Sequence, residues 1–135
     1  MDVPLIAAGL LALVAAAIHG GAGEVLVVRR LPTEALHSTR FGGPRMTMAM
    51  IHVTWHIATI AFLALGSALL VAGSVLEDEV AQAVAVVAAA AFTGFGILGL
   101  AIGGVITSPR GLLRHPGPLV FVATAALAWW GAQLT

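Results

Sequence analysis

The feature that most constrains this chain is a succession of apolar segments, each close to or above the roughly 20 residues that cross a bilayer as a helix. Across the whole sequence 60% of residues are hydrophobic and only 9% are charged, whereas a soluble domain carries about 25% charged residues. The sequence therefore predicts a single-domain, all-α integral membrane protein in contact with the lipid bilayer. Its four transmembrane helices are expected to form a bundle, with spans at about residues 3–28, 46–76, 80–107 and 117–134.

The positions of the arginines predict the orientation of the bundle. The chain contains no lysine, and its six arginines lie in the first and third inter-span loops, at Arg29, Arg30, Arg40, Arg45, Arg110 and Arg114. Positively charged loops stay on the cytoplasmic side, so both termini and the Glu77–Glu79 turn are expected outside, with the bacterial cytoplasmic (inner) membrane as the location. The formal net charge of +0 and the lack of a basic tract argue against nucleic acid as a partner.

Two features of the loops indicate further organisation. The first loop favours a short interfacial segment over about residues 32–39. The pattern Arg-x-x-Gly-Pro occurs at Arg40–Pro44 and again 74 positions later, at Arg114–Pro118, and the same offset relates His19 to Thr93. Either the chain consists of two tandem parallel helical hairpins, or Gly-Pro simply starts a helix at each interface, where proline is tolerated.

The third apolar segment contains the spacing Gly99-x-x-x-Gly103. Small residues at this spacing let two helix backbones approach closely in a membrane. The contact is expected either within the bundle or between molecules, as the seam of a homo-oligomer or of a larger membrane complex.

Three histidines are predicted to share one depth. His52 and His56 are four residues apart and therefore lie on one face of a helix. His56 is 11 residues past Arg45, about 16 Å along a helix, and His19 is ten residues before Arg29, about 15 Å. All three histidines would lie in the cytoplasmic half of the bundle, with His115 at the cytoplasmic start of the last span.

Glu24 is the one acidic residue within an apolar segment, five positions after His19. Five helical steps of 100° place it about 140° around the helix from His19. The two side chains therefore cannot point to one centre without a local distortion, and an ion pair with an arginine at the cytoplasmic edge is the expected role of Glu24.

The histidine cluster predicts a membrane protein that binds haem or a metal, with redox or electron transfer as a possible role; whether it is an enzyme stays open. Facing imidazoles can be axial ligands of haem b, in an arrangement similar in kind to membrane b-type cytochromes, with Arg29 and Arg45 pairing with the propionates. A divalent transition metal would instead take imidazole and carboxylate ligands. The candidate metal ligands are His19, His52, His56, Glu24 and His115.

Two other functions fit the same sequence. An accessory or structural membrane subunit would use its histidines only in hydrogen bonds to neighbouring helices. A proton or ion pathway would use their titration near neutral pH, but it needs polar groups across the whole thickness, and the outer half offers only serine and threonine.

The expected orientation is open to a direct test. Single cysteines can be introduced without interference because the chain has no native cysteine. A cysteine replacing Asp78 should react with an impermeant thiol reagent added outside, and one replacing Arg40 only after the cytoplasmic side is exposed. The reverse labelling pattern would contradict the orientation and the depths argued from it.

Overall fold

The computed structural model describes the backbone of residues 1–106 and 116–135, and the side chains of residues 1–102 and 116–135. Within this part the chain is helical, and its one β-type contact is an isolated bridge between Thr39 and Gly42. The main helices are α1 (Val3–Ala17), α3 (Pro44–Ser74), α4 (Asp78–Ile106) and α6 (Gly117–Gly131). A six-residue π-helix, η1 (Ile18–Gly23), and the short α2 (Glu24–Leu26) continue α1.

Three helical stretches are long and apolar enough to cross a membrane: Val3–Arg30, Pro44–Ser74 and Asp78–Ile102. The fourth helix, α6, is apolar but has only 15 residues, which is about 22 Å of helix. Of the four expected spans, three therefore correspond to helices of sufficient length in the described structure, and the fourth corresponds to a shorter apolar helix.

Local signals set the helix starts. The Asp2 carboxylate accepts a hydrogen bond from the Leu5 backbone N–H at 2.8 Å and caps α1. Pro44 and Pro118 lie in the first turns of α3 and α6, where the missing N–H of proline has no partner to lose.

The loop that follows α2 contains only short 3₁₀ turns. They are η2 (Val28–Arg30) and η3 (Thr33–Ala35), so the interfacial segment expected over residues 32–39 is reduced to a single turn. Both residues that flank this turn, Pro32 and Leu36, have extended backbone conformations, and these prevent the helix from continuing.

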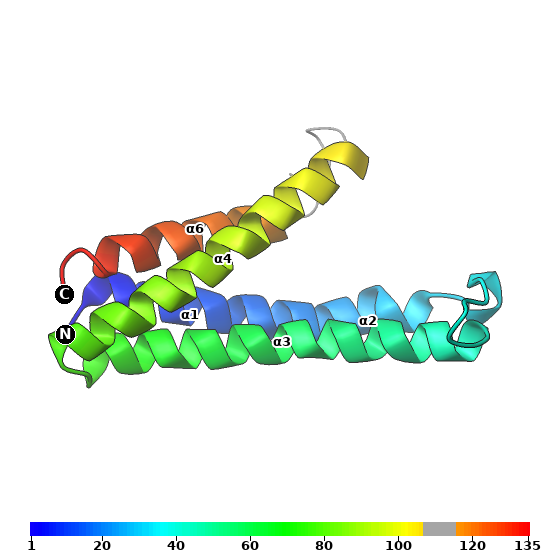
Figure 1. Cartoon of the computed structure of the whole chain (residues 1–135), viewed down its shortest axis with the longest axis horizontal. Coiled ribbons are helices and arrows are strands. Elements are labelled where there is room, and N and C mark those ends of the chain that lie inside the picture. Colours follow the sequence, from blue (N-terminus) through cyan, green and yellow to red (C-terminus); the bar gives the residue numbers. More distant parts are fainter. Residues whose placement is uncertain (107–115) are drawn as a thin grey trace.

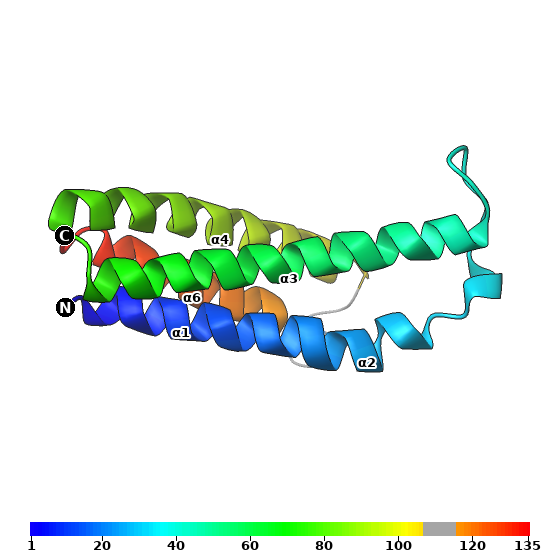
Figure 2. The same ribbon diagram turned by 90° about the horizontal axis from the view of Figure 1, so that it is seen from below.

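The helices form two antiparallel pairs. α1 packs along α3, and α4 packs along α6; α1 also contacts α6, and α3 contacts α4. Figure 1 shows both termini at one end of the molecule and the carboxyl end of α4 turning away from α3. In Figure 2 the α1–α2 stretch and α3 run side by side over almost their whole length.

Alanine and phenylalanine make up most of the buried core. Phe62, Phe92, Phe95 and Phe121 bring α3, α4 and α6 together, with every pair of ring centroids 4.8–6.3 Å apart. From this cluster to the end with the termini the core is mainly alanine, as in Ala8, Ala12, Ala72, Ala85, Ala89 and Ala128. Such small side chains allow the helices to pack closely.

A tryptophan contact recurs in the two helix pairs. The Trp55 indole donates to the His19 carbonyl oxygen at 3.1 Å, across the α1–α3 pair. The Trp129 indole donates to the Thr93 hydroxyl, also at 3.1 Å, across the α4–α6 pair. In each pair the tryptophan follows its partner by 36 residues.

The expected close contact at Gly99 lies within the bundle. A Cβ at Gly99 would come 3.0 Å from Cγ of Pro118 in α6. The side chain environment of Gly103 is not described by the structure. The same holds for the whole of three residues for which the sequence made predictions, Arg110, Arg114 and His115.

The tightest approach between α1 and α3 predicts where stability is most sensitive. A Cβ at Gly9 would come 2.8 Å from the Gly66 carbonyl oxygen, whereas a Cβ at Gly94 meets nothing within 4 Å. Gly9→Ala should lower the free energy of unfolding in detergent by about 1–3 kcal/mol through overpacking. Gly94→Ala is the matched control and should be neutral or slightly stabilising, since alanine favours a helix. Equal midpoints of thermal unfolding for the two variants would contradict the contact.

Candidate metal centre

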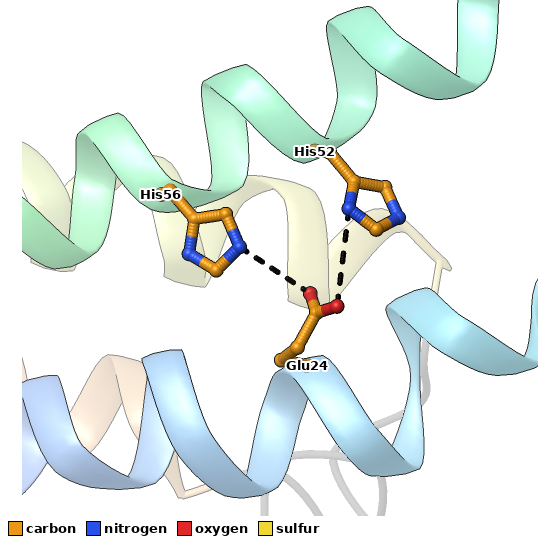
Figure 3. Close-up of side chains that lie close together, drawn as sticks. All are labelled: Glu24, His52 and His56. Carbon is orange, nitrogen blue, oxygen red and sulfur yellow. Dashed lines mark ion pairs between the residues drawn. The ribbon is translucent and has the colours of Figure 1, made fainter.

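Glu24, His52 and His56 form the one group of potential metal ligands found among the described residues. Glu24 Oε1 lies 3.8 Å from His52 Nδ1, and Glu24 Oε2 lies 3.6 Å from His56 Nε2. Figure 3 shows both imidazoles on successive turns of α3, facing the carboxylate from the opposite helix. One ligand atom from each residue lies within 4.8 Å of the others, so the three can reach a common point.

The carboxylate is the buried member of this group. The Glu24 side chain is 9% exposed, whereas those of His52 and His56 are 37% and 48% exposed. Arg29 donates from Nε to Glu24 Oε1 at 3.1 Å, which confirms the expected ion pair with an arginine. Glu24 Oε2 is buried and has no hydrogen-bond partner.

The π-helix η1 explains how Glu24 faces α3. A π-turn closes its hydrogen bonds one residue later than an α-turn and therefore takes up one extra residue. The extra residue rotates the residues that follow it back around the helix axis by about 100°. Glu24 therefore lies about 40° around the helix from His19, rather than about 140° as in a regular α-helix. The structure thus contains the local distortion that a common orientation requires.

His19 lies outside this group, although the sequence analysis placed it there. Its Nδ1 lies 2.9 Å from the Thr59 hydroxyl oxygen, and its ring stacks on Trp55 with centroids 4.0 Å apart and planes 14° from parallel. His19 therefore forms a separate layer with Thr59 and Trp55, beside the phenylalanine cluster that its ring meets edge-on at Phe62.

The glycines near His19 admit α3 side chains rather than a macrocycle. A Cβ at Gly20 would come 3.1 Å from Oγ1 of Thr59, and one at Gly23 would come 2.6 Å from Cζ2 of Trp55. The space expected for haem b beside His19 is therefore filled by Trp55 and Thr59, and the geometry does not indicate haem.

Of the other predicted site residues, Arg45 takes no part in this group. Arg45 is exposed in the first turn of α3, next to Gly43 and Pro44. His115 lies outside the described residues. Sequence reasoning did not single out Trp55, whose indole hydrogen-bonds the His19 carbonyl; its position one residue before His56 was the available signal.

The separations of the three ligand groups are compatible with a metal ion. In a tetrahedral site with bonds of about 2.0–2.1 Å, the ligand atoms lie about 3.3–3.5 Å apart. The Glu24–His56 and Glu24–His52 separations of 3.6 and 3.8 Å need only small side-chain movements to reach that value. Three protein ligands also leave one position open, as in catalytic rather than structural zinc sites.

Comparisons of the chain with protein-family models, with curated proteins and with solved structures gave no match.

The role of η1 predicts an unusual response to changes of length. Deleting Gly21 should convert the π-turn to a regular α-turn and leave Glu24 facing α3, because four α-helical steps also place it about 40° from His19. Inserting one glycine after Gly21 should instead rotate the Glu24 side chain by a further step of about 100° around the helix, away from α3.

The measurement is cross-linking of Glu24→Cys with His56→Cys by a short bifunctional thiol reagent. The original-length chain and the deletion should cross-link, and the insertion should not. Cross-linking of the insertion with loss in the deletion would show that η1 does not set the direction of Glu24.

Proposed function

We propose that the protein is an integral membrane protein that binds one divalent transition metal through Glu24, His52 and His56. The metal would lie in the cytoplasmic half of the bundle, between α2 and α3, with at least one coordination position free for an outside ligand. Redox chemistry or metal handling at that open position is the proposed role.

The unpartnered oxygen of Glu24 carries this proposal. A buried acceptor without a hydrogen bond costs about 1–3 kcal/mol, and more when it is charged. Arg29 binds Oε1, but Oε2 faces the ring nitrogen of His56 at 3.6 Å with no donor of its own. A cation bound between Oε2 and the imidazoles would satisfy this oxygen and use the lone pairs of both histidines.

The ligand set narrows the choice of metal. Imidazole suits zinc, copper, iron and nickel, whereas magnesium and calcium prefer sites built from oxygen alone. Two histidines and one carboxylate with open positions are the ligands of catalytic zinc sites and of non-haem iron(II) oxygenases. The chain has no cysteine, so thiolate ligation has no part in the site.

The second helical hairpin is the α4–α6 pair, and its packing speaks against a purely structural role for Glu24, His52 and His56. We infer that the chain is a tandem duplication, because the offset of 74 residues that relates Arg40–Pro44 to Arg114–Pro118 also relates Trp55 to Trp129, which make corresponding contacts. At the positions of Glu24, His52 and His56 the second hairpin has Leu98, Ala126 and Trp130. The α4–α6 pair packs without the polar group, so hairpin packing does not require it.

Membrane insertion is supported by the surface of the bundle. Large apolar side chains are exposed on every long helix, among them Leu10, Val53, Ile57, Ile60, Val87 and Ile97. Extensive exposed apolar surface of this kind marks contact with a membrane or partner. The mainly alanine core on the outer side of the phenylalanine cluster favours a site reached from the cytoplasmic side over a pathway through the bundle.

Titration of the metal-free, detergent-solubilised protein with Co²⁺ tests the proposal, because the visible spectrum of Co²⁺ reports its ligands. One ion should bind per chain, and Glu24→Gln, His52→Ala or His56→Ala should each weaken binding about tenfold or more, equivalent to at least 1.4 kcal/mol. His37→Ala is the matched control, since His37 lies in the exposed first loop, and it should bind Co²⁺ as the unmodified protein does.

Two outcomes would overturn the proposal. One is a protein that binds no Co²⁺, or binds it equally well in all three ligand variants. The other is purified protein with the visible bands of haem, abolished by His52→Ala, which would replace the bare metal by haem.

A further inference from the structure

A pocket of about 310 Å³ lies between the first helical stretch and α6. Leu11, Val14 and Ile18 line it from α1, and Pro118 and Phe121 line it from α6. Among the described residues of its wall, His19 carries the one polar side chain. A mostly apolar pocket of this volume with a single polar group is the usual form of a small-molecule site.

The hydrogen bonds of Thr59 favour one of the two neutral forms of His19. Thr59 has one hydroxyl hydrogen, and it donates this hydrogen to the Trp55 carbonyl oxygen at 3.2 Å. Thr59 Oγ1 also lies 2.9 Å from His19 Nδ1, and both contacts are hydrogen bonds at once only when Nδ1–H donates to Oγ1. A neutral imidazole has one N–H, so Nε2 holds a lone pair.

The described residues provide neither a hydrogen bond to Nε2 nor an ion pair to His19. The two ring nitrogens point in widely different directions, so Nε2 points away from Thr59, and His19 lines the pocket. An acceptor in an apolar wall recognises a ligand that offers a donor.

We propose that this pocket binds a lipid-soluble molecule with an aromatic hydroxyl group, a hydroquinone or phenol, whose O–H donates to His19 Nε2. The apolar wall takes the ring, with Phe121 able to pack against it, and any alkyl tail leaves past Val14 and Ile18, which are 54% and 60% exposed. A ligand with only a carbonyl oxygen would meet the lone pair of Nε2 and bind less well. The site is separate from the proposed metal centre and does not depend on it.

A pair of matched ligands tests the donor directly: a decyl-substituted hydroquinone and its dimethyl ether, which has nearly the same shape but no O–H. Both are titrated into the detergent-solubilised protein, with partition into empty micelles subtracted. The hydroquinone should bind about five- to tenfold more tightly than the ether, as expected for one hydrogen bond.

Three variants assign the effect. His19→Phe keeps an aromatic ring beside Trp55 and should abolish the difference between the two ligands. Ala15→Leu should weaken both ligands, because Ala15 lines the pocket and the added carbons fill it. His37→Ala, in the exposed first loop, belongs to neither site and should leave the binding of both ligands unchanged.

Equal binding of the two ligands by the unmodified protein would overturn the proposal, because the pocket would then take any alkyl chain, including that of a lipid. A difference that persists in His19→Phe, or binding that Ala15→Leu does not alter, would place the ligand elsewhere. Since the comparison of ligands uses the unmodified chain, it stands even if a variant fails to fold.

Discussion

The close approach of the first helix to α3 is the contact on which the rest of the structure depends. It is made by glycines: at Gly9 a Cβ would come 2.8 Å from the Gly66 carbonyl, and at Gly23 one would come 2.6 Å from the Trp55 ring. Because these positions lack a side chain, the two backbones approach closely over several turns. The same approach places Glu24 opposite His52 and His56, at 3.8 and 3.6 Å from their ring nitrogens, which is compatible with a shared cation.

A carboxylate in such a seam destabilises the fold unless something binds it. Removing an ion from water costs several kcal/mol even after relaxation, and Arg29 contacts only one of the two Glu24 oxygens. In the proposed duplication, Leu98 of the α4–α6 pair stands where the α1–α3 pair has Glu24, and α4 packs along α6 without that carboxylate. A buried polar group that carries this cost agrees with the proposed role in binding rather than in folding, since departures from local consistency concentrate at functional sites.

The sequence predicted part of the candidate site and missed the rest for identifiable reasons. The shared face of His52 and His56 follows from their spacing alone, and the ion pair of Glu24 with an arginine follows from its distance to the helix end. The place of His19 was not predictable from depth, because depth along a helix says nothing about which neighbour occupies the space beside a ring. Trp55 occupies that space, stacked on His19 at 4.0 Å.

The sequence by itself determined the helical class, the long apolar stretches, the helix starts at Pro44 and Pro118, and the i, i+4 pair of histidines. All of these depend on composition or on neighbours within a turn or two, where helical geometry is fixed. Only the tertiary structure decided that Glu24 joins His52 and His56 while His19 joins Thr59. The direction of Glu24 depends on the one extra residue taken up in η1. The neighbours of His19 depend on which α3 side chains fit against the glycines of η1. Both are set by packing between segments that lie more than 20 residues apart in the sequence.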